Sequence, residues 1–380
     1  MKRFICLFLI FAALLTSSAY AETPSAGITP SVAAPSAVLM EKRTGEVLYE
    51  KKAHDHYFPA SVTKVMTLLL IAEDIESGKI SLDDTVTASK RAASFGGSCV
   101  YLAEGEQMTV NDMLKCIAVV SANDCAVAMA EHLSGSEELF VQRMNERASA
   151  LGLEDTHFTN CTGLFDDNNH YTSAYDVAVM SRELLRHEFI KEYTTIWMDS
   201  IRNGEFGLSS TNRLVYWYPG CTGLKTGYTS TAKYCISATA ERDGVEYIAV
   251  IMHSETADSR NADAQALLDY AFANYTLCSL RSGTPLPAIP VELGRAASVQ
   301  AVYGGPEYAL TAKTGAEPEY TLDIESSAAA PVHAGDRLGT LTVRSGGKVV
   351  ASVPVLAGED VPRLGVFGIV ALLAGRMVGL

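Results

Sequence analysis

The sequence predicts a mixed α/β domain with a mostly antiparallel sheet and a helical subdomain, followed by a small all-β sandwich domain. Strand-like runs lie at both ends of the first region, over 37–49 and 234–252, and helical patterns fill the residues between them. Strands from distant parts of the chain must then meet in one sheet. A Pro-rich break at 282–290 precedes short alternating runs with Gly-rich turns, which are typical of a β-sandwich.

The first residues have the pattern of a secretory signal peptide. Lys2 and Arg3 precede an apolar run over 4–15, and a small-residue cleavage site ends at Ala21. The apolar run is shorter than a bilayer span, so we expect cleavage after Ala21 rather than an anchor helix. Residues 22–35 are rich in Pro, Ser and Ala, which predicts a disordered linker. The mature protein is expected to act outside the cytoplasm.

The first folded domain is expected over 36–277, and its elements follow the hydrophobic pattern. They are, in order, a strand pair over 37–49, a helix that ends near Gly78, a helical stretch to about Leu185 with a cap at Thr109 and Asp112, strands over 234–240 and 247–252, and a helix over 263–275.

The second domain is expected over 278–362, with strands such as 339–344 and 348–353. The segment 363–380 is apolar over most of its length and too short to span a bilayer. We expect an amphipathic anchor that lies in the membrane interface, with a buried C-terminal strand as the alternative.

Charge and cysteine content exclude several classes of function. The formal net charge is −14, which argues against a nucleic-acid partner. Eight cysteines become seven without Cys6, and their spacings contain no C-x-x-C or C-x-x-H pair. Neither a zinc site nor a disulfide framework is predicted, and no cofactor is expected.

Ser61 and Lys64 stand one helical turn apart at the start of an apolar helix that Pro59 opens. On a helix this spacing lets the lysine amine reach the serine hydroxyl, which predicts a nucleophile with its base. Ser230 and Lys233 have the same spacing, but they lead into a strand-like run. Positions three apart on an extended chain point to opposite faces, so this second pair is discarded.

Two further motifs follow in order, S-x-N at 121–123 and K-T-G at 225–227. The first interrupts a helical region, where a short break aims polar side chains into a cleft. The second opens a probable strand, whose edge can align a peptide by main-chain hydrogen bonds. Copies occur at 210–212, 259–261 and 313–315, so context must choose among them; the last is expected to be an ordinary turn.

With these three motifs in this order, the chain resembles the serine penicillin-binding proteins. Four further segments, over 96–102, 105–110, 158–164 and 218–229, look like the D-alanyl-D-alanine carboxypeptidases among the low-molecular-mass members. The likeness is strong over 33–277. It implies a penicillin-binding/β-lactamase-like α/β fold there, with that family's β-domain and membrane anchor following.

The resemblance implies a serine hydrolase that removes the terminal D-alanine from peptidoglycan pentapeptide stems. Ser61 would attack the carbonyl, and the proton would go to Lys64 or pass through Ser121; both assignments stay open. Burial and a nearby Lys225 would favour a neutral Lys64 amine. Asn123 would hold the substrate amide or fix Lys64.

Substrate-binding residues are also implied by the resemblance. The oxyanion would be held by the backbone N–H groups of Ser61 and of Tyr228, which follows Gly227. Arg260 falls at the family's carboxylate-binding position, where its fork suits a bidentate contact. Thr226 is the second candidate for that carboxylate, and a surface ion pair is the alternative for Arg260.

Two other functions stay open, a D,D-endopeptidase that cuts cross-links and a catalytically silent penicillin-binding or wall-binding sensor. A β-lactamase is disfavoured because no E-x-x-x-N stands over 160–169. The expected partners are the stem pentapeptide, β-lactam antibiotics as covalent inhibitors, and the outer face of the cytoplasmic membrane.

Overall fold

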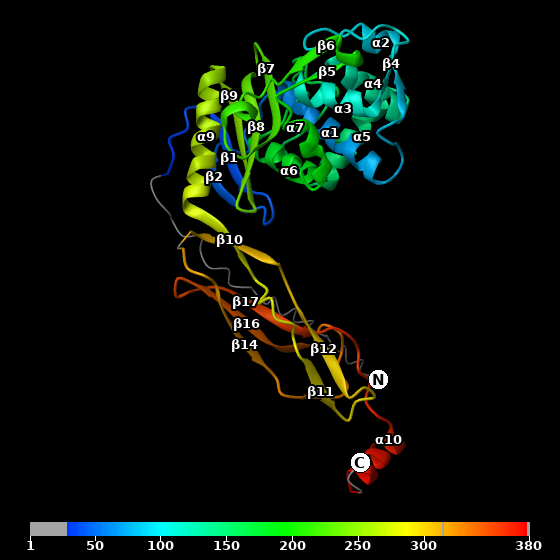
Figure 1. The fold of residues 1–380 in the computed structure, drawn as a ribbon, viewed down its shortest axis with the longest axis vertical. Coiled ribbons are helices and arrows are strands. Elements are labelled where there is room, and N and C mark those ends of the chain that lie inside the picture. Colours follow the sequence, from blue (N-terminus) through cyan, green and yellow to red (C-terminus); the bar gives the residue numbers. More distant parts are fainter. Residues whose placement is uncertain (1–28, 314, 378–380) are drawn as a thin grey trace, which may run out of the picture. The chain divides into compact units, whose positions relative to one another are not determined.

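The computed structural model describes residues 29–313 and 315–377; the predicted signal peptide lies outside these residues. The chain divides into two compact units, one that ends at Thr276 and one that begins at Leu277 (Figure 1).

A five-stranded sheet in the order β2-β1-β9-β8-β7 forms the centre of the first unit, and every neighbouring pair is antiparallel. Val38 of the first strand lies opposite Val250, so the sheet joins distant parts of the chain. The strands are β1 (Ser36–Glu41), β2 (Val47–Lys51), β7 (Cys221–Thr229), β8 (Lys233–Arg242) and β9 (Val245–Ser254).

Helices cover both faces of this sheet. The long helix α9 (Ala257–Asn274) packs on β8 and β9, and α6 (Ala174–Leu184) packs on β1 and β9 (Figure 1). Because both faces are covered, β9 is a nearly continuous apolar run that is buried along almost its whole length.

The helical subdomain is built around α1 (Lys64–Glu76), which is buried on all sides from Lys64 to Ala72. Five helices of the first unit begin at a Ser or Thr whose side chain accepts a backbone N–H three residues on, as the predicted cap of Thr109 on Asp112 does. The remaining helices and hairpins of this unit are α2 (Lys90–Ala93), α3 (Val110–Val119), α4 (Asn123–Ser134), α5 (Glu137–Ala150), α7 (Lys191–Thr194), α8 (Leu214–Trp217), β3 (Thr85–Thr87) with β4 (Gln107–Thr109), and β5 (Met198–Ile201) with β6 (Phe206–Ser209).

The segment before β1 is ordered further back than its composition predicts. The backbone N–H groups of Ala33 and Ala34 donate to the two carboxylate oxygens of Asp263, at 3.0 and 2.8 Å. Lys51 Nζ donates to the carbonyls of Val32 and Ala34, both at 2.8 Å. Composition carries no sign of these contacts, because their partners lie elsewhere in the chain.

Over its described residues, the second unit is all β apart from its last helix. Leu341, Val343, Val353 and Val355 alternate with more exposed residues along two paired strands, which places its core on one face. Its elements are β10 (Tyr275–Ser279) paired in a two-stranded sheet with β13 (Tyr308–Ala312), a six-stranded sheet of β14 (Glu319–Ile324), β16 (Arg337–Ser345), β17 (Lys348–Ala357), β12 (Ser298–Tyr303), β11 (Ala288–Glu292) and β15 (Ala328–Ala329), and the helix α10 (Val366–Met377). Among the described residues, no helix combines the length and hydropathy needed to cross a bilayer.

Candidate active site

Ser61 lies in a 3-10 turn, Ala60–Thr63, that leads directly into α1. Two glycines let other segments approach this turn. A Cβ built on Gly163 would lie 1.7 Å from the Ala60 carbonyl oxygen, and one on Gly227 would lie 2.9 Å from the Pro59 carbonyl oxygen and 3.1 Å from Ser61 N. Both positions therefore exclude larger residues, and strand β7 lies directly against the predicted nucleophile.

The amine of Lys64 is fully buried and has three polar neighbours. Its Nζ lies 3.1 Å from Ser61 Oγ, 2.6 Å from Asn123 Oδ1 and 2.8 Å from the Thr162 carbonyl oxygen. A neutral amine has two N–H donors and one lone pair, so it can donate to the two carbonyl oxygens and accept the Ser61 hydroxyl proton. Burial lowers the pKa of Lys64 to about 7, which makes the neutral form available near neutral pH.

The break between α3 and α4 places the S-x-N motif against this amine. Ser121 adopts a φ of 63°, which is uncommon for a residue other than glycine, and α4 begins two residues later at Asn123. The Asn123 amide bridges two groups, since Oδ1 accepts from Lys64 and Nδ2 donates to the Gly96 carbonyl at 2.8 Å. Ser121 Oγ is buried and finds no hydrogen-bond partner within the described part of the chain.

Lys225 is also buried, but its amine has different neighbours. Its Nζ donates to the Thr226 carbonyl at 2.8 Å. Burial, together with the positive charges of Lys64 and Arg260, lowers the pKa of Lys225 well below its usual range. The K-T-G lysine therefore lies close enough to the S-x-x-K lysine for their charges to interact.

These residues face a cleft of about 530 Å³. Ser61, Ser121, Thr226, Gly227, Tyr228 and Arg260, all singled out from the sequence, line it. Lys64, Asn123 and Lys225 lie buried behind its wall. The structure thus brings every predicted site residue into one region.

Arg260 is only 5% exposed and forms no ion pair with an acidic residue of the described chain. Its Nε and one terminal nitrogen donate to Asn261 Oδ1, at 3.1 and 2.9 Å, and its guanidinium lies 5.9 Å from the Tyr234 ring centre. Burial lowers the pKa of Arg260 to about 10. The surface ion pair considered as the alternative does not describe this residue, and a buried cation facing a cleft suits an anionic ligand.

Sequence reasoning missed two groups that complete the cleft. Thr211 accepts a hydrogen bond from Thr226 Oγ1 at 2.8 Å, and Arg213 adds a second guanidinium to the lining. Both belong to the stretch around the S-x-N copy at 210–212. The Asn212 amide of that copy donates to the Gly223 carbonyl at 2.8 Å, so this motif positions β7.

A buried histidine supports the nucleophile turn and was also missed. His170 Nδ1 accepts from the Thr159 backbone N–H at 3.0 Å, which leaves Nε2–H to donate to Thr63 Oγ1 at 2.8 Å. Thr63 Oγ1 in turn donates to the Ala60 carbonyl at 2.8 Å. Burial lowers the pKa of His170 to about 4, so the ring stays neutral and this chain of bonds persists.

Comparison with known proteins follows the same division of the chain. Residues 21–256 match the family model described as D-alanyl-D-alanine carboxypeptidase. The chain belongs to this family. Residues 279–363 match the model described as penicillin-binding protein 5, C-terminal domain.

Relatives of this family extend over nearly the whole chain. The D-alanyl-D-alanine carboxypeptidase DacF of Bacillus subtilis is 42% identical over 374 residues, 96% of each chain. Penicillin-binding protein 5 from Haemophilus influenzae superposes with a TM-score of 0.77 and 28% identity, covering 89% of this chain and all of that one. Penicillin-binding protein D2 from Listeria monocytogenes, solved in an ampicillin-bound form, gives 0.59 and 29% identity over 64% of this chain and all of that one.

These matches confirm three predictions. The family suggested by the motifs is the family found, and the predicted architecture of an α/β domain followed by a β domain agrees with the related folds. The protein is an enzyme of the hydrolase class, a D-alanyl-D-alanine carboxypeptidase by family.

Proposed function

We propose that the protein removes the terminal D-alanine from peptidoglycan stem pentapeptides through an acyl-enzyme on Ser61. The proposal depends on one observation: Lys64 Nζ has one hydroxyl and two carbonyl oxygens within 3.1 Å. As Ser61 Oγ bonds to the scissile carbonyl carbon, its proton moves to the neutral Lys64 amine. The backbone N–H groups of Ser61 and Tyr228 stabilise the oxyanion.

The proton must then reach the leaving amine of D-alanine. Ser121 lines the same cleft, and its hydroxyl has no partner within the described residues. It is therefore free to accept a proton from Lys64 and donate its own to the departing nitrogen, which breaks the peptide bond. Water, activated by the same Lys64, then attacks the ester and releases the shortened stem.

Recognition of a free C-terminus would fall to the cationic end of the cleft. Arg260 and Arg213 line it together with Thr226, whose hydroxyl is held by Thr211. Two guanidinium groups and a hydroxyl match a terminal carboxylate, and the buried Arg260 leaves N–H donors for it. This arrangement favours stems that end in D-alanine over internal cross-links.

We also propose the domain limits and location drawn from the sequence: a cleaved signal peptide over 1–21, a linker over 22–35, the peptidase over 36–277, a β-domain over 278–362 and an anchor over 363–380. Phe367 of α10 is 93% exposed and Val366 75% exposed. Apolar side chains of a short helix, left in water, suit the interface of a bilayer. The enzyme would then work outside the cytoplasm, on the outer face of the cytoplasmic membrane.

A single set of assays tests the activity. The purified protein is incubated with a peptide ending in Lys-D-Ala-D-Ala, and released D-alanine is measured for the wild type and for Ser61→Ala. Release that depends on Ser61 supports the proposal, and labelling by fluorescent penicillin without release would instead favour a sensor. Cleavage confined to cross-linked dimers would assign an endopeptidase.

A further inference from the structure

Asp124 directly follows the S-x-N motif and is a buried carboxylate that the proposed mechanism does not use. It lies in the first turn of α4 and is 1% exposed. Its two oxygens accept from three backbone N–H groups, those of Val100 at 3.1 Å, Leu102 at 3.1 Å and Cys125 at 2.9 Å. Burial of an ionised group is costly even with such donors, so a carboxylate kept next to the motif indicates a role.

The same carboxylate holds residues 96–102, the wall segment, which contributes Ser98 to the lining of the cleft. The wall segment in turn holds Asn123. The Gly96 carbonyl accepts from Asn123 Nδ2 at 2.8 Å, and the Ser98 carbonyl accepts from the Asn123 backbone N–H at 2.7 Å. Asn123 Oδ1 lies 2.6 Å from Lys64 Nζ. The position of this amide against the lysine amine therefore depends on where the wall segment is fixed.

The wall segment has a second contact, which comes from the turn between β5 and β6. Arg202 Nη1 donates to the Val100 carbonyl at 2.9 Å, and Arg202 Nε pairs with Glu106 at 2.7 Å. Both backbone groups of Val100 are thus held, the N–H by Asp124 and the carbonyl by Arg202. The Arg202 side chain is 25% exposed, so it can be replaced without opening the core.

Titratable groups from four segments act on the Lys64 amine; they are Cys99, Asp124, Cys161 and Lys225. Burial raises the pKa of both thiols, so they stay neutral near neutral pH. Of these four groups, Asp124 therefore supplies the negative charge. This charge favours the ammonium form of Lys64, whereas burial and the charge of Lys225 favour the neutral amine.

The elements packed against α4 contribute a paired charge and buried thiols. Arg91 of α2 pairs with Glu137 of α5. Cys116 of α3 and Cys125 of α4 are fully buried, and burial raises the pKa of Cys125 well above its usual range. Neither the ion pair nor the thiols cancel the charge of Asp124, which therefore acts on the buried amine.

We propose that Asp124 is a positioning residue for acylation, which orients Asn123 through the wall segment and keeps one negative charge beside the buried Lys64 amine. Burial alone would leave this amine a weaker base. A base is most effective when its pKa lies near the working pH, and the carboxylate offsets part of the effect of burial. This inference rests on the proposed function, because it takes from it the role of Lys64 as the base.

Asp124→Asn removes the charge and keeps the size of the side chain. We expect the midpoint of the pH profile of acylation to fall from about 7 to about 6, because less now opposes the burial of Lys64. The rate on the plateau at high pH should fall about tenfold, since the new amide N–H meets the backbone N–H groups of the wall segment. Rapid mixing with penicillin over a range of pH gives both values.

Two further variants separate charge from position. Asp124→Glu keeps the charge but moves it by one methylene, so the plateau should fall while the midpoint stays near 7. Arg202→Met frees the same wall segment from the other side, and the plateau should again fall, by about threefold, with the midpoint near 7. Asp74→Asn is the matched control, because Asp74 is a 6% exposed carboxylate near the opposite end of α1 that pairs with Arg143. It should leave both values as in the wild type.

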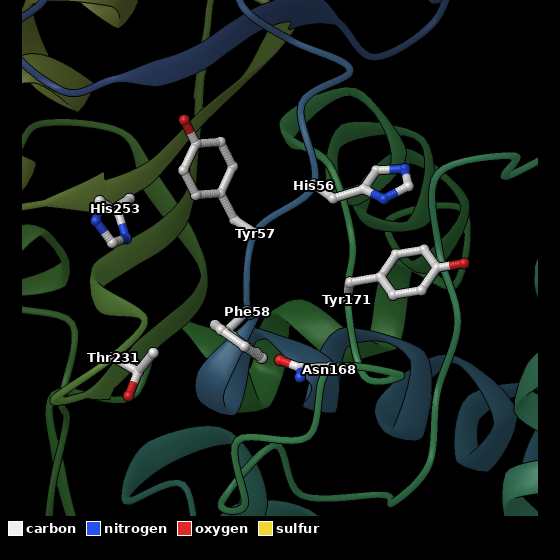
Figure 2. Close-up of a pocket in the computed structure, with 7 residues that line it drawn as sticks. All are labelled: His56, Tyr57, Phe58, Asn168, Tyr171, Thr231 and His253. Atoms are coloured by element: carbon white, nitrogen blue, oxygen red, sulfur yellow. The ribbon is translucent and has the colours of Figure 1, made fainter.

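The variants lie outside a second cavity, of about 420 Å³, that shares no lining residue with the cleft. Figure 2 shows the side chains around it, among them Tyr57 and Tyr171. Its lining includes no residue of the wall segment or of α4. A change in acylation caused by these variants is therefore assigned to the cleft.

The outcomes separate this inference from the proposed function. A midpoint that stays near 7 in Asp124→Asn, or that falls equally in Asp74→Asn, would overturn the role of the charge. A wild-type plateau in Arg202→Met would overturn the role of the wall segment, and circular dichroism checks that each variant is folded. D-alanine release by the wild type would still support the activity in either case, whereas its absence would overturn the proposed function.

Discussion

Lys64 at the start of α1 and Lys225 on β7 are both buried beside the same cleft, but the two regions offer a lysine amine different partners. Lys64 Nζ has two carbonyl acceptors and the Ser61 hydroxyl, whereas Lys225 Nζ donates to the carbonyl of its own neighbour. Burial lowers the pKa of both. Only Lys64 has a hydroxyl from which to take a proton.

The two buried lysines are therefore suited to different roles. On the helix side, burial produces a base, because a neutral amine is held against an alcohol. On the strand side, Arg260 lines the cleft and Lys225 lies buried near it, so a bound anion would stabilise the charged forms of both. The helix side is suited to proton transfer, and the strand side to binding and polarisation.

Of the variants considered, removal of the base is expected to have the largest effect on acylation. Lys64→Met keeps an apolar chain of similar length but deletes the amine, and we expect penicillin acylation to slow by about a thousandfold or more. The unpaired oxygens of Asn123 and Thr162 will also lower stability. Acylation rates from intact-protein mass spectrometry, with circular dichroism to check folding, measure both effects. An acylation rate close to that of the wild type would remove Lys64 from the mechanism.

The approach of β7 to the nucleophile turn is the next target. Gly227→Ala puts a Cβ 2.9 Å from the Pro59 carbonyl oxygen, so the strand must move and carry the Tyr228 N–H with it. We expect a loss of about a hundredfold in acylation rate, as when one oxyanion donor is removed. Gly207→Ala on β6, where a Cβ meets nothing within 4 Å, is the matched control. Similar rates for the two variants would contradict this role.

Arg260→Ala tests the strand side alone. Loss of a charge-assisted contact to the terminal carboxylate should lower kcat/KM for D-alanine release by about thirtyfold and leave penicillin acylation largely unchanged. Steady-state release from Lys-D-Ala-D-Ala peptides and penicillin labelling, run on the same preparation, compare the two. Equal loss of both activities would assign Arg260 a structural role.

The sequence could predict the parts of the site that are side chains in motifs, but not the parts that are backbone groups. The motif spacing in the sequence identifies four side chains that the structure places together, namely Ser61, Lys64, Asn123 and Lys225. The Thr162 carbonyl that accepts a hydrogen bond from the Lys64 amine could not be identified in this way, since every residue has a carbonyl.

The fold was predictable in class but not in detail, for a related reason. The runs of β1 and β9 indicate strands, whereas their pairing across some two hundred residues is set by packing. In the same way, Arg213 joins the cleft only through tertiary structure. Motifs thus locate the reaction centre, and substrate subsites assembled from separate segments require the fold.

The smallest expected effect is the pH dependence of the acylation rate, which tests whether Lys64 is the base. The pKa of Lys64 is lowered to about 7, so the amine is mostly protonated below pH 7 and mostly neutral above it. Since the neutral form is the base, the acylation rate should rise about tenfold between pH 6 and pH 8 and then level off. Rapid-mixing measurements with a fluorescent penicillin, chosen with a dye that does not titrate in this range, give the profile. A rate that stays flat from pH 6 to pH 8 would mean that no base with a pKa near 7 limits acylation, and it would contradict the assignment of this role to Lys64.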